Sequence, residues 1–191
     1  MKREHAAGVL IFIGTFVFLV AMIVAEAKYP NYSIANNYVS DLGVGSTAYI
    51  FNSTIIIFGV LLIIGAVLIA SNQRRSVFPY LLIIAAIGAI MVGSFPENTG
   101  SLHSVGAYIT FLFAAIAAIV GVTWIKSPFR FLSLAIGLFI AAAIFLYIEK
   151  MYLGIGVGGM ERMIVDPALF WGLGLSSYLS SWASDWYHNI F

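Results

Sequence analysis

Long apolar segments and short polar segments alternate along the whole chain. Six segments are apolar enough to form helices that cross a membrane, at about residues 6–27, 48–70, 77–94, 104–125, 129–148 and 167–184. Most of them approach the roughly 20 apolar residues that one helical crossing of a bilayer requires. The pattern predicts an all-α polytopic membrane protein, a six-helix transmembrane bundle that forms a single domain over residues 1–191.

The composition excludes several other classes of protein. Hydrophobic residues make up 62% of the chain and charged residues only 9%, a balance that a soluble domain of 191 residues could not cover with polar surface. The net charge of +1 argues against a nucleic-acid partner. Cysteine is absent, which excludes disulfides, thiolate catalysis and cysteine metal sites. Three histidines are too few to build a histidine-rich zinc or haem site easily.

The basic residues indicate which side of the membrane each end of the bundle faces. An even number of spans places both termini on one side. That side carries Lys2, Arg3, Arg74, Arg75, Lys126 and Arg130, and the other carries Lys28, Lys150 and Arg162. Basic residues are enriched on the cytoplasmic side, so we predict cytoplasmic termini in a multi-pass protein of the cell membrane. A chemical site is then expected at the extracytoplasmic mouth, where the three polar loops lie.

The longest polar segment, residues 36–45, precedes the second apolar segment. It contains Asn37, Ser40 and Asp41, and Asn52 follows inside the apolar segment. A carboxylate before a helix can serve only to cap free N–H groups, and that is the structural explanation for Ser40 and Asp41. The alternative is that Asp41 points into the mouth of the bundle as an orienting group, base or metal ligand. Asn37, Ser40 and Asn52 would then be substrate-binding neighbours.

His103 begins the fourth apolar segment and is the one histidine on the predicted outward face. Glu97 lies in the same short loop, which holds both side chains near the membrane boundary. An isolated histidine is often only a hydrogen-bonding residue, but an imidazole also suits general acid or base catalysis near neutral pH. We therefore regard His103 as a candidate catalytic residue and Glu97 as a candidate substrate-binding residue.

A third polar loop is predicted over residues 149–166, where a run of glycines precedes Glu161 and Arg162. Arg162 is a candidate substrate-binding residue for an anionic group such as a lipid phosphate, because guanidinium binds such groups through paired hydrogen bonds. Glu161 is a candidate catalytic carboxylate, or else an ion-pair partner of Lys150 across the loop. Asp166-Pro167 is expected to open the last helix with an acidic cap and a first-turn proline.

Two sets of motifs resemble membrane protein families. Residues 37–43, Asn-Tyr-Val-Ser-Asp-Leu-Gly, together with Phe95-Pro96-Glu97 and His103, resemble a prokaryotic family of six-span proteins catalogued only as a domain of unknown function. This resemblance runs over most of the chain and implies the six-helix bundle without an activity. More loosely, the Ser-Asp pair and His103 are similar to the eukaryotic family of autophagy modulators and GPI-lipid remodelling proteins. That resemblance implies Ser40, Asp41 and His103 as site residues and a lipid as ligand.

These features together predict a lipid-handling membrane protein whose polar site lies on the extracytoplasmic face, either a lipid hydrolase or a transferase. Asp41, His103 and Glu161 would be catalytic, with His103 activating water or a hydroxyl group and Asp41 orienting it. Three oxygen or nitrogen ligands could alternatively hold a divalent metal. The alternative function is a non-catalytic accessory subunit whose polar loops bind other membrane subunits, since no complete catalytic signature is present.

Overall fold

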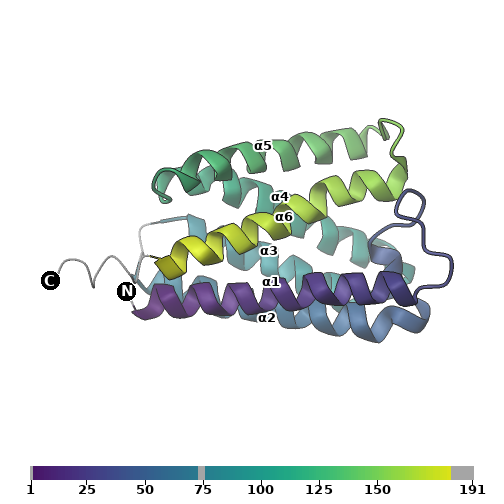
Figure 1. Ribbon diagram of the computed structural model, residues 1–191, viewed down its shortest axis with the longest axis horizontal. Helices are drawn as coiled ribbons and strands as arrows, with labels where there is room; N and C mark the ends of the chain where they lie inside the picture. The colour runs from purple at the N-terminus through teal and green to yellow at the C-terminus, as the bar shows by residue number, and fades with distance from the viewer. Residues whose placement is uncertain (1, 73–75, 182–191) are drawn as a thin grey trace, which may run out of the picture.

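The computed structural model describes residues 2–72 and 76–181, and within these ranges the chain is all-α (Figure 1). The six helices are α1 (Lys2–Lys28), α2 (Ala48–Asn72), α3 (Phe78–Ser94), α4 (Ser101–Val120), α5 (Phe129–Ile148) and α6 (Gly156–Ser181). Four short 3₁₀ helices occur in the connections, η1 (Ser40–Gly43), η2 (Gly45–Thr47), η3 (Glu97–Thr99) and η4 (Gly121–Thr123). The predicted fold class is confirmed.

The helices have the lengths and composition of membrane helices. Within the described residues, four are long and apolar enough to cross a membrane, in the segments Arg3–Lys28, Gly45–Ser71, Ser101–Thr123 and Phe129–Ile148. A fifth, α3, is apolar but has only 17 residues. The structure is therefore that of a helical membrane bundle.

The six helices form a closed ring. Each helix packs against its neighbours in the chain, and α6 packs back against α1. Figure 1 shows the connections 29–47 and 149–155 at one end of the bundle, which we call the loop end; the 95–100 connection lies there too. At the other end, which we call the terminal end, lie the start of α1 and the last described turn of α6.

Glycines let neighbouring helices of the ring approach closely. A Cβ atom added to Gly88 of α3 would lie 2.7 Å from the Gly106 carbonyl oxygen of α4, and one added to Gly59 of α2 would lie 2.9 Å from the Ala86 carbonyl oxygen of α3. Such short distances leave no room for a side chain. Close backbone contact of this kind holds helices together in lipid, because the hydrophobic effect does not drive helices to associate there.

The start of α6 differs from the prediction. The helix begins at Gly156, about eleven residues before the expected start at Pro167, which lies inside the helix. The reason is tertiary: the glycines pack directly on the backbone of residues 34–37, and the Gly158 N–H donates to the Ala35 carbonyl at 3.0 Å. Asp166 is consequently a mid-helix residue, and the prediction that it caps the helix was wrong.

Candidate functional site

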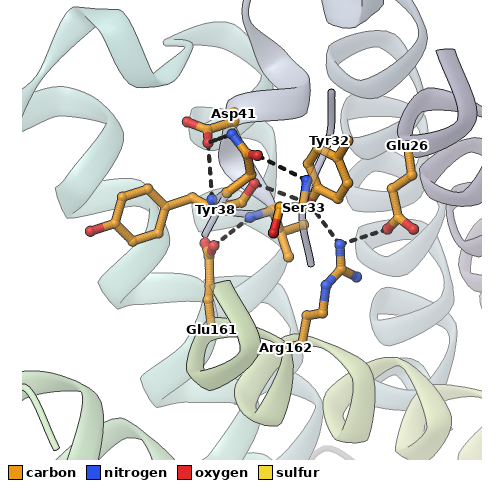
Figure 2. A network of polar contacts seen from close by, with 9 residues as sticks. Glu26, Tyr32, Ser33, Tyr38, Asp41, Glu161 and Arg162 are labelled. Atoms are coloured by element: carbon orange, nitrogen blue, oxygen red, sulfur yellow. Dashed lines mark hydrogen bonds and ion pairs between the residues drawn. The ribbon is translucent and has the colours of Figure 1, made fainter. Parts of the chain in front are cut away.

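The polar site forms where the loop between α1 and α2 meets the first turns of α6. Glu161 is only 7% exposed, and its Oε2 accepts a hydrogen bond from the Val39 N–H at 2.5 Å. The adjacent Arg162 reaches instead toward α1, as Figure 2 shows. Its Nη2 donates to Glu26 Oε1 and to the Tyr32 hydroxyl, both at 2.7 Å. These two neighbouring side chains of α6 therefore hold the loop at two separate points.

The Tyr32 hydroxyl extends this attachment further into the loop. Burial raises the pKa of Tyr32 to about 12 in spite of the neighbouring guanidinium, so the hydroxyl stays protonated near neutral pH. It lies 3.2 Å from the Tyr38 carbonyl oxygen and donates to it. The guanidinium of Arg162 also lies over the Tyr32 ring, 5.6 Å from its centroid. The loop is thus anchored by charge, hydrogen bonding and ring contact together.

Asp41 organises the residues just before η1. Its Oδ2 accepts hydrogen bonds from Asn37 Nδ2 at 2.9 Å and from the Tyr38 N–H at 3.0 Å (Figure 2). The Asn37 Oδ1 in turn accepts from the Ser33 N–H at 3.0 Å. Asp41 therefore satisfies N–H groups of its own loop rather than those at the start of α2, and it gives the Ser40 region a defined shape.

Glu97 in η3 lies beside Asp41 at the loop end. Burial, with a further contribution from the Asp41 carboxylate, raises the pKa of Glu97 to about 7, although a hydrogen bond with Ser40 acts in the opposite direction. Two neighbouring carboxyl groups favour a state in which only one is ionised, because two negative charges at short distance repel each other. Near neutral pH, Glu97 is therefore able both to release and to accept a proton.

His103 in the first turn of α4 is held in one tautomer. The residue is 7% exposed, and its Nδ1 lies 2.9 Å from the Phe95 carbonyl oxygen. A carbonyl oxygen can only accept a hydrogen bond, so the proton of the neutral imidazole must be on Nδ1. The lone pair is then on Nε2, which makes Nε2 the atom that can take a proton from a bound molecule.

Two cavities meet at Ser40, His103 and Glu161. A polar cavity of about 420 Å³ lies at the loop end, lined in part by Glu97 and Tyr147. An apolar cavity of about 90 Å³ runs along the inside of the ring. Ser40, His103 and Glu161 line both cavities. The buried polar groups of the site therefore stand at a junction between polar and apolar space.

The comparison with protein families adds one finding to this geometry. The model of a family described as "Protein of unknown function (DUF998)" matches residues 12–178. The chain belongs to this family. Comparison with curated proteins and with solved structures found no match. DUF998 membership confirms the predicted resemblance to a family of unknown function, whereas the similarity to autophagy modulators and GPI-lipid remodelling proteins stays a prediction.

Half of the predicted site residues line the polar cavity of this DUF998 protein. They are Ser40, Glu97, His103 and Glu161. They come from η1, η3, α4 and α6, so residues from all three predicted polar loops are brought together at the loop end. The sequence could not show this convergence.

The other predicted site residues lie outside both cavities and support the loop. Asn37 and Asp41 bond to each other, and Asn52 Nδ2 of α2 donates to the Gly43 carbonyl at 2.9 Å. Arg162 already has Glu26 and Tyr32 as partners. The alternative pairing of Glu161 with Lys150 is not found, because Glu161 is buried against Val39 and Lys150 is exposed.

Two tyrosines that line the polar cavity were missed by the sequence reasoning. Tyr38 precedes η1, Tyr147 lies in the last turn of α5, and their rings meet edge to face with centroids 6.5 Å apart. Burial raises the pKa of Tyr38, so its hydroxyl remains a hydrogen-bond donor. The available signal for Tyr147 was its position near the end of an apolar segment, where tyrosines favour the membrane interface.

A divalent metal finds no ligand set in the described part of the DUF998 chain. Among residues 2–72 and 76–181, no group of three or more His, Asp or Glu side chains is arranged so that it could hold a metal ion. The polar cavity itself is lined by the oriented imidazole of His103, the carboxyl groups of Glu97 and Glu161, and several hydroxyl groups.

Proposed function

We propose that this protein is a multi-pass protein of the cell membrane that binds a membrane lipid at its extracytoplasmic face and acts on it as a hydrolase or transferase. The observation that carries the proposal is the junction of a polar and an apolar cavity at Ser40, His103 and Glu161. A lipid has the same two-part character, because a polar head is joined to an apolar chain. The linkage between head and chain would lie at the junction.

The polar cavity reaches the lipid-facing surface between α4 and α5. Its lining includes Tyr108 and Leu112 of α4 and Ile148 of α5, which are 53%, 49% and 55% exposed. Leu112 lies eleven residues from the start of α4, or about 16 Å along the helix axis. An opening at that depth supports sideways entry of a lipid from the bilayer.

The charges around the polar cavity favour a lipid head that is neutral or carries an amine. Glu97 and Glu161 contribute carboxyl groups to the lining, and no lysine or arginine is among the described residues that line it. The nearest predicted anion-binding residue, Arg162, is engaged by Glu26 and Tyr32. An anionic head would therefore meet carboxylates without a free cation to offset them.

The arrangement supports acyl transfer or hydrolysis by general acid and base catalysis. His103 Nε2 accepts a proton from water or from an acceptor hydroxyl, whose oxygen then attacks the carbonyl carbon of the lipid ester. Glu97, next to Asp41, donates a proton to the oxygen that leaves. Glu161 is held by the Val39 N–H at the edge of both cavities, where it can orient the attacking hydroxyl.

The test is lipid turnover by the purified protein in nanodiscs of a defined phospholipid and diacylglycerol mixture, with products identified by mass spectrometry. His103→Ala removes the proposed base and should lower the rate about a hundredfold or more. His5→Ala is the matched control, because His5 is exposed at the terminal end of α1 and should leave the rate unchanged.

Equal turnover by the two variants would contradict the role of His103. Absence of turnover by the wild-type protein, together with a second membrane chain that co-purifies with it, would favour the accessory-subunit alternative instead.

A further inference from the structure

Two buried side chains of the polar cavity each keep one acceptor atom without a partner. Glu161 and His103 are both 7% exposed, and both line the cavity. Glu161 uses Oε2 to accept from the Val39 N–H. His103 uses Nδ1 to donate to the Phe95 carbonyl. Among the described residues, no donor meets Glu161 Oε1 or His103 Nε2. Buried acceptors of this kind favour a ligand that brings N–H or O–H groups.

Glu161 also lacks a counter-ion in the described part of the chain. The adjacent Arg162 forms its ion pair with Glu26, at 2.7 Å. A buried carboxylate is costly unless a cation is paired with it. No group of three or more His, Asp or Glu side chains that could hold a metal ion occurs among residues 2–72 and 76–181. An organic cation therefore fits this lining better than a metal ion does.

The described lining of the polar cavity also includes four aromatic residues. They are Tyr38, Tyr108, Phe111 and Tyr147. The rings of Tyr38 and Tyr147 meet edge to face, with centroids 6.5 Å apart. The faces of aromatic rings attract ammonium groups, because the π-electrons carry partial negative charge. The cavity volume of about 420 Å³ lies within the range of roughly 300–1,000 Å³ that small-molecule sites have. Its size and its lining both suit a polar group that bears an amine.

The free acceptor atoms favour a primary ammonium group over a quaternary one. A primary ammonium group carries three N–H donors, as the lysine side chain does, and one of them can meet Glu161 Oε1. A quaternary ammonium group has no N–H and would leave that oxygen unpaired. An ionised carboxyl group has about four lone-pair sites. Glu161 can therefore accept from an ammonium group and still orient the attacking hydroxyl of the proposed reaction.

We infer that the polar cavity binds a primary ammonium group, with Glu161 as its counter-ion and the rings of Tyr38 and Tyr147 beside it. The inference rests on the proposed function and names its substrate class: a membrane lipid whose head carries a primary amine. A zwitterionic head brings its own cation, which suits a described lining without lysine or arginine. A soluble amine carries the same ammonium group, so the experiment has one arm for each source.

The first arm measures which lipid head stays bound. The purified protein in nanodiscs with equal amounts of dioleoyl phosphatidylethanolamine, phosphatidylcholine and phosphatidylglycerol is extracted into mild detergent, washed, and analysed by native mass spectrometry. The three lipids share their acyl chains, so only the head differs. The wild-type protein should retain phosphatidylethanolamine about tenfold over phosphatidylcholine, as expected for a hydrogen bond to a charged group.

Glu161→Gln should abolish this preference. The amide oxygen of glutamine can still accept from the Val39 N–H, whereas the charge that pairs with the ammonium group is removed. Glu149→Gln is the matched control, because Glu149 is exposed, lines neither cavity and should leave the preference unchanged.

A second pair of variants applies if Glu161→Gln fails to fold, as judged by gel filtration. Tyr147→Leu removes a ring from the cavity and should lower the preference about threefold. Tyr80→Leu is its control, since Tyr80 is 46% exposed on α3 and lines neither cavity.

The second arm tests a soluble amine. Ethanolamine is added to the protein in nanodiscs of phosphatidylcholine alone, and the thermal midpoint is measured against tetramethylammonium at the same concentration. Ethanolamine should raise the midpoint of the wild-type protein and of Glu149→Gln, and it should not raise that of Glu161→Gln, because a ligand stabilises only the protein that binds it.

The two arms separate the inference from the proposed function. Lipid retained without preference for phosphatidylethanolamine, and no effect of ethanolamine, would overturn the ammonium site and leave the lipid function standing. A response to ethanolamine without any retained lipid would overturn the lipid as the source of the amine, and with it the proposed function. Absence of both signals in the wild-type protein would overturn both proposals.

Discussion

Asp41 and Glu97 place two carboxyl groups side by side at the loop end, where Glu97 and the oriented imidazole of His103 line the same polar cavity. The pKa of Glu97 is raised from 4.5 to about 7 by burial and by the Asp41 carboxylate. Between pH 4.5 and about 7, Glu97 therefore binds more protons in the folded protein than in the unfolded chain. Stability from this group is fully present below pH 4.5 and is lost as the pH rises through about 7.

Glu97→Gln should therefore weaken the dependence of stability on pH. The wild-type thermal midpoint in nanodiscs should fall between pH 4.5 and about 7, by roughly 2 to 4 °C for each kcal/mol lost. Glutamine mimics the protonated carboxyl group, so the variant should show a smaller fall, measured by intrinsic fluorescence during heating. Glu149→Gln, at an exposed position after α5, is the control and should keep the wild-type profile. Equal profiles for Glu97→Gln and the wild type would contradict the proposed proton uptake.

At the scale of an element, the early start of α6 is the feature that builds the site. Helix formation from Gly156 brings Glu161 and Arg162 onto adjacent positions of the second turn, from which one reaches Val39 and the other reaches Glu26. Had the segment remained a loop, neither side chain would be held against a fixed partner. Glycine at position 158 makes this possible, because the carbonyl groups of residues 34 and 37 lie against it.

Gly158→Ala should destabilise the protein more than the adjacent Gly159→Ala does. A Cβ atom at position 158 would collide with the Asn37 and Ile34 carbonyl oxygens, the latter at 2.6 Å, which are backbone atoms of an anchored loop. At position 159 it would meet only the Ile155 side chain at 3.1 Å. Overpacking of this kind costs about 1–3 kcal/mol. The measurement is the thermal midpoint of each variant in nanodiscs, and equal midpoints would contradict the tight packing of α6 on the loop.

In the whole molecule, the ring of helices separates the polar side chains at the loop end from the largely apolar interior of the bundle. The polar groups gather at the loop end, while a hydrogen-bonded chain from Trp171 through Ser133 to the Ala118 carbonyl ties α6, α5 and α4 together deeper in the bundle. The Trp171 N–H and the Ser133 hydroxyl thus find their hydrogen-bond acceptors within the protein, which is necessary inside a membrane because water is scarce there. The orientation of the ring then decides which side of the membrane the site serves.

Single cysteines can test that orientation, since the chain contains none. Asn98→Cys lies in η3 at the loop end, and Ser127→Cys lies in the connection before α5 at the terminal end, both at exposed positions. The excess of basic residues at the terminal end predicts that a membrane-impermeant maleimide labels Asn98→Cys on intact cells. Ser127→Cys should be labelled only after permeabilisation. The reverse pattern would place the site on the cytoplasmic face.

The helices of this protein could be predicted because their signal is local. The predicted segment 129–148 coincides with α5 (Phe129–Ile148), and the predicted segment 77–94 differs from α3 (Phe78–Ser94) by one residue. The predicted segments 6–27 and 104–125 differ by up to five residues from α1 (Lys2–Lys28) and α4 (Ser101–Val120). The largest difference was at α6, whose first turns are rich in glycine and carry charges, a composition that normally indicates a loop. Its helical form depends on contact with residues 34–37, which lie more than a hundred positions earlier in the chain.

The amino-acid sequence alone predicts a bundle of apolar helices with polar residues gathered in three loops, because hydrophobicity and span length are properties of contiguous residues. It also identified His103, Glu97, Ser40 and Glu161 as candidates, because polar groups near a membrane boundary are few. The folded arrangement shows that these four share a cavity, that Arg162 is paired with Glu26 and Tyr32, and that a smaller apolar cavity adjoins the polar one. These features depend on how six helices close into a ring, and the contacts that close it join residues far apart in the chain.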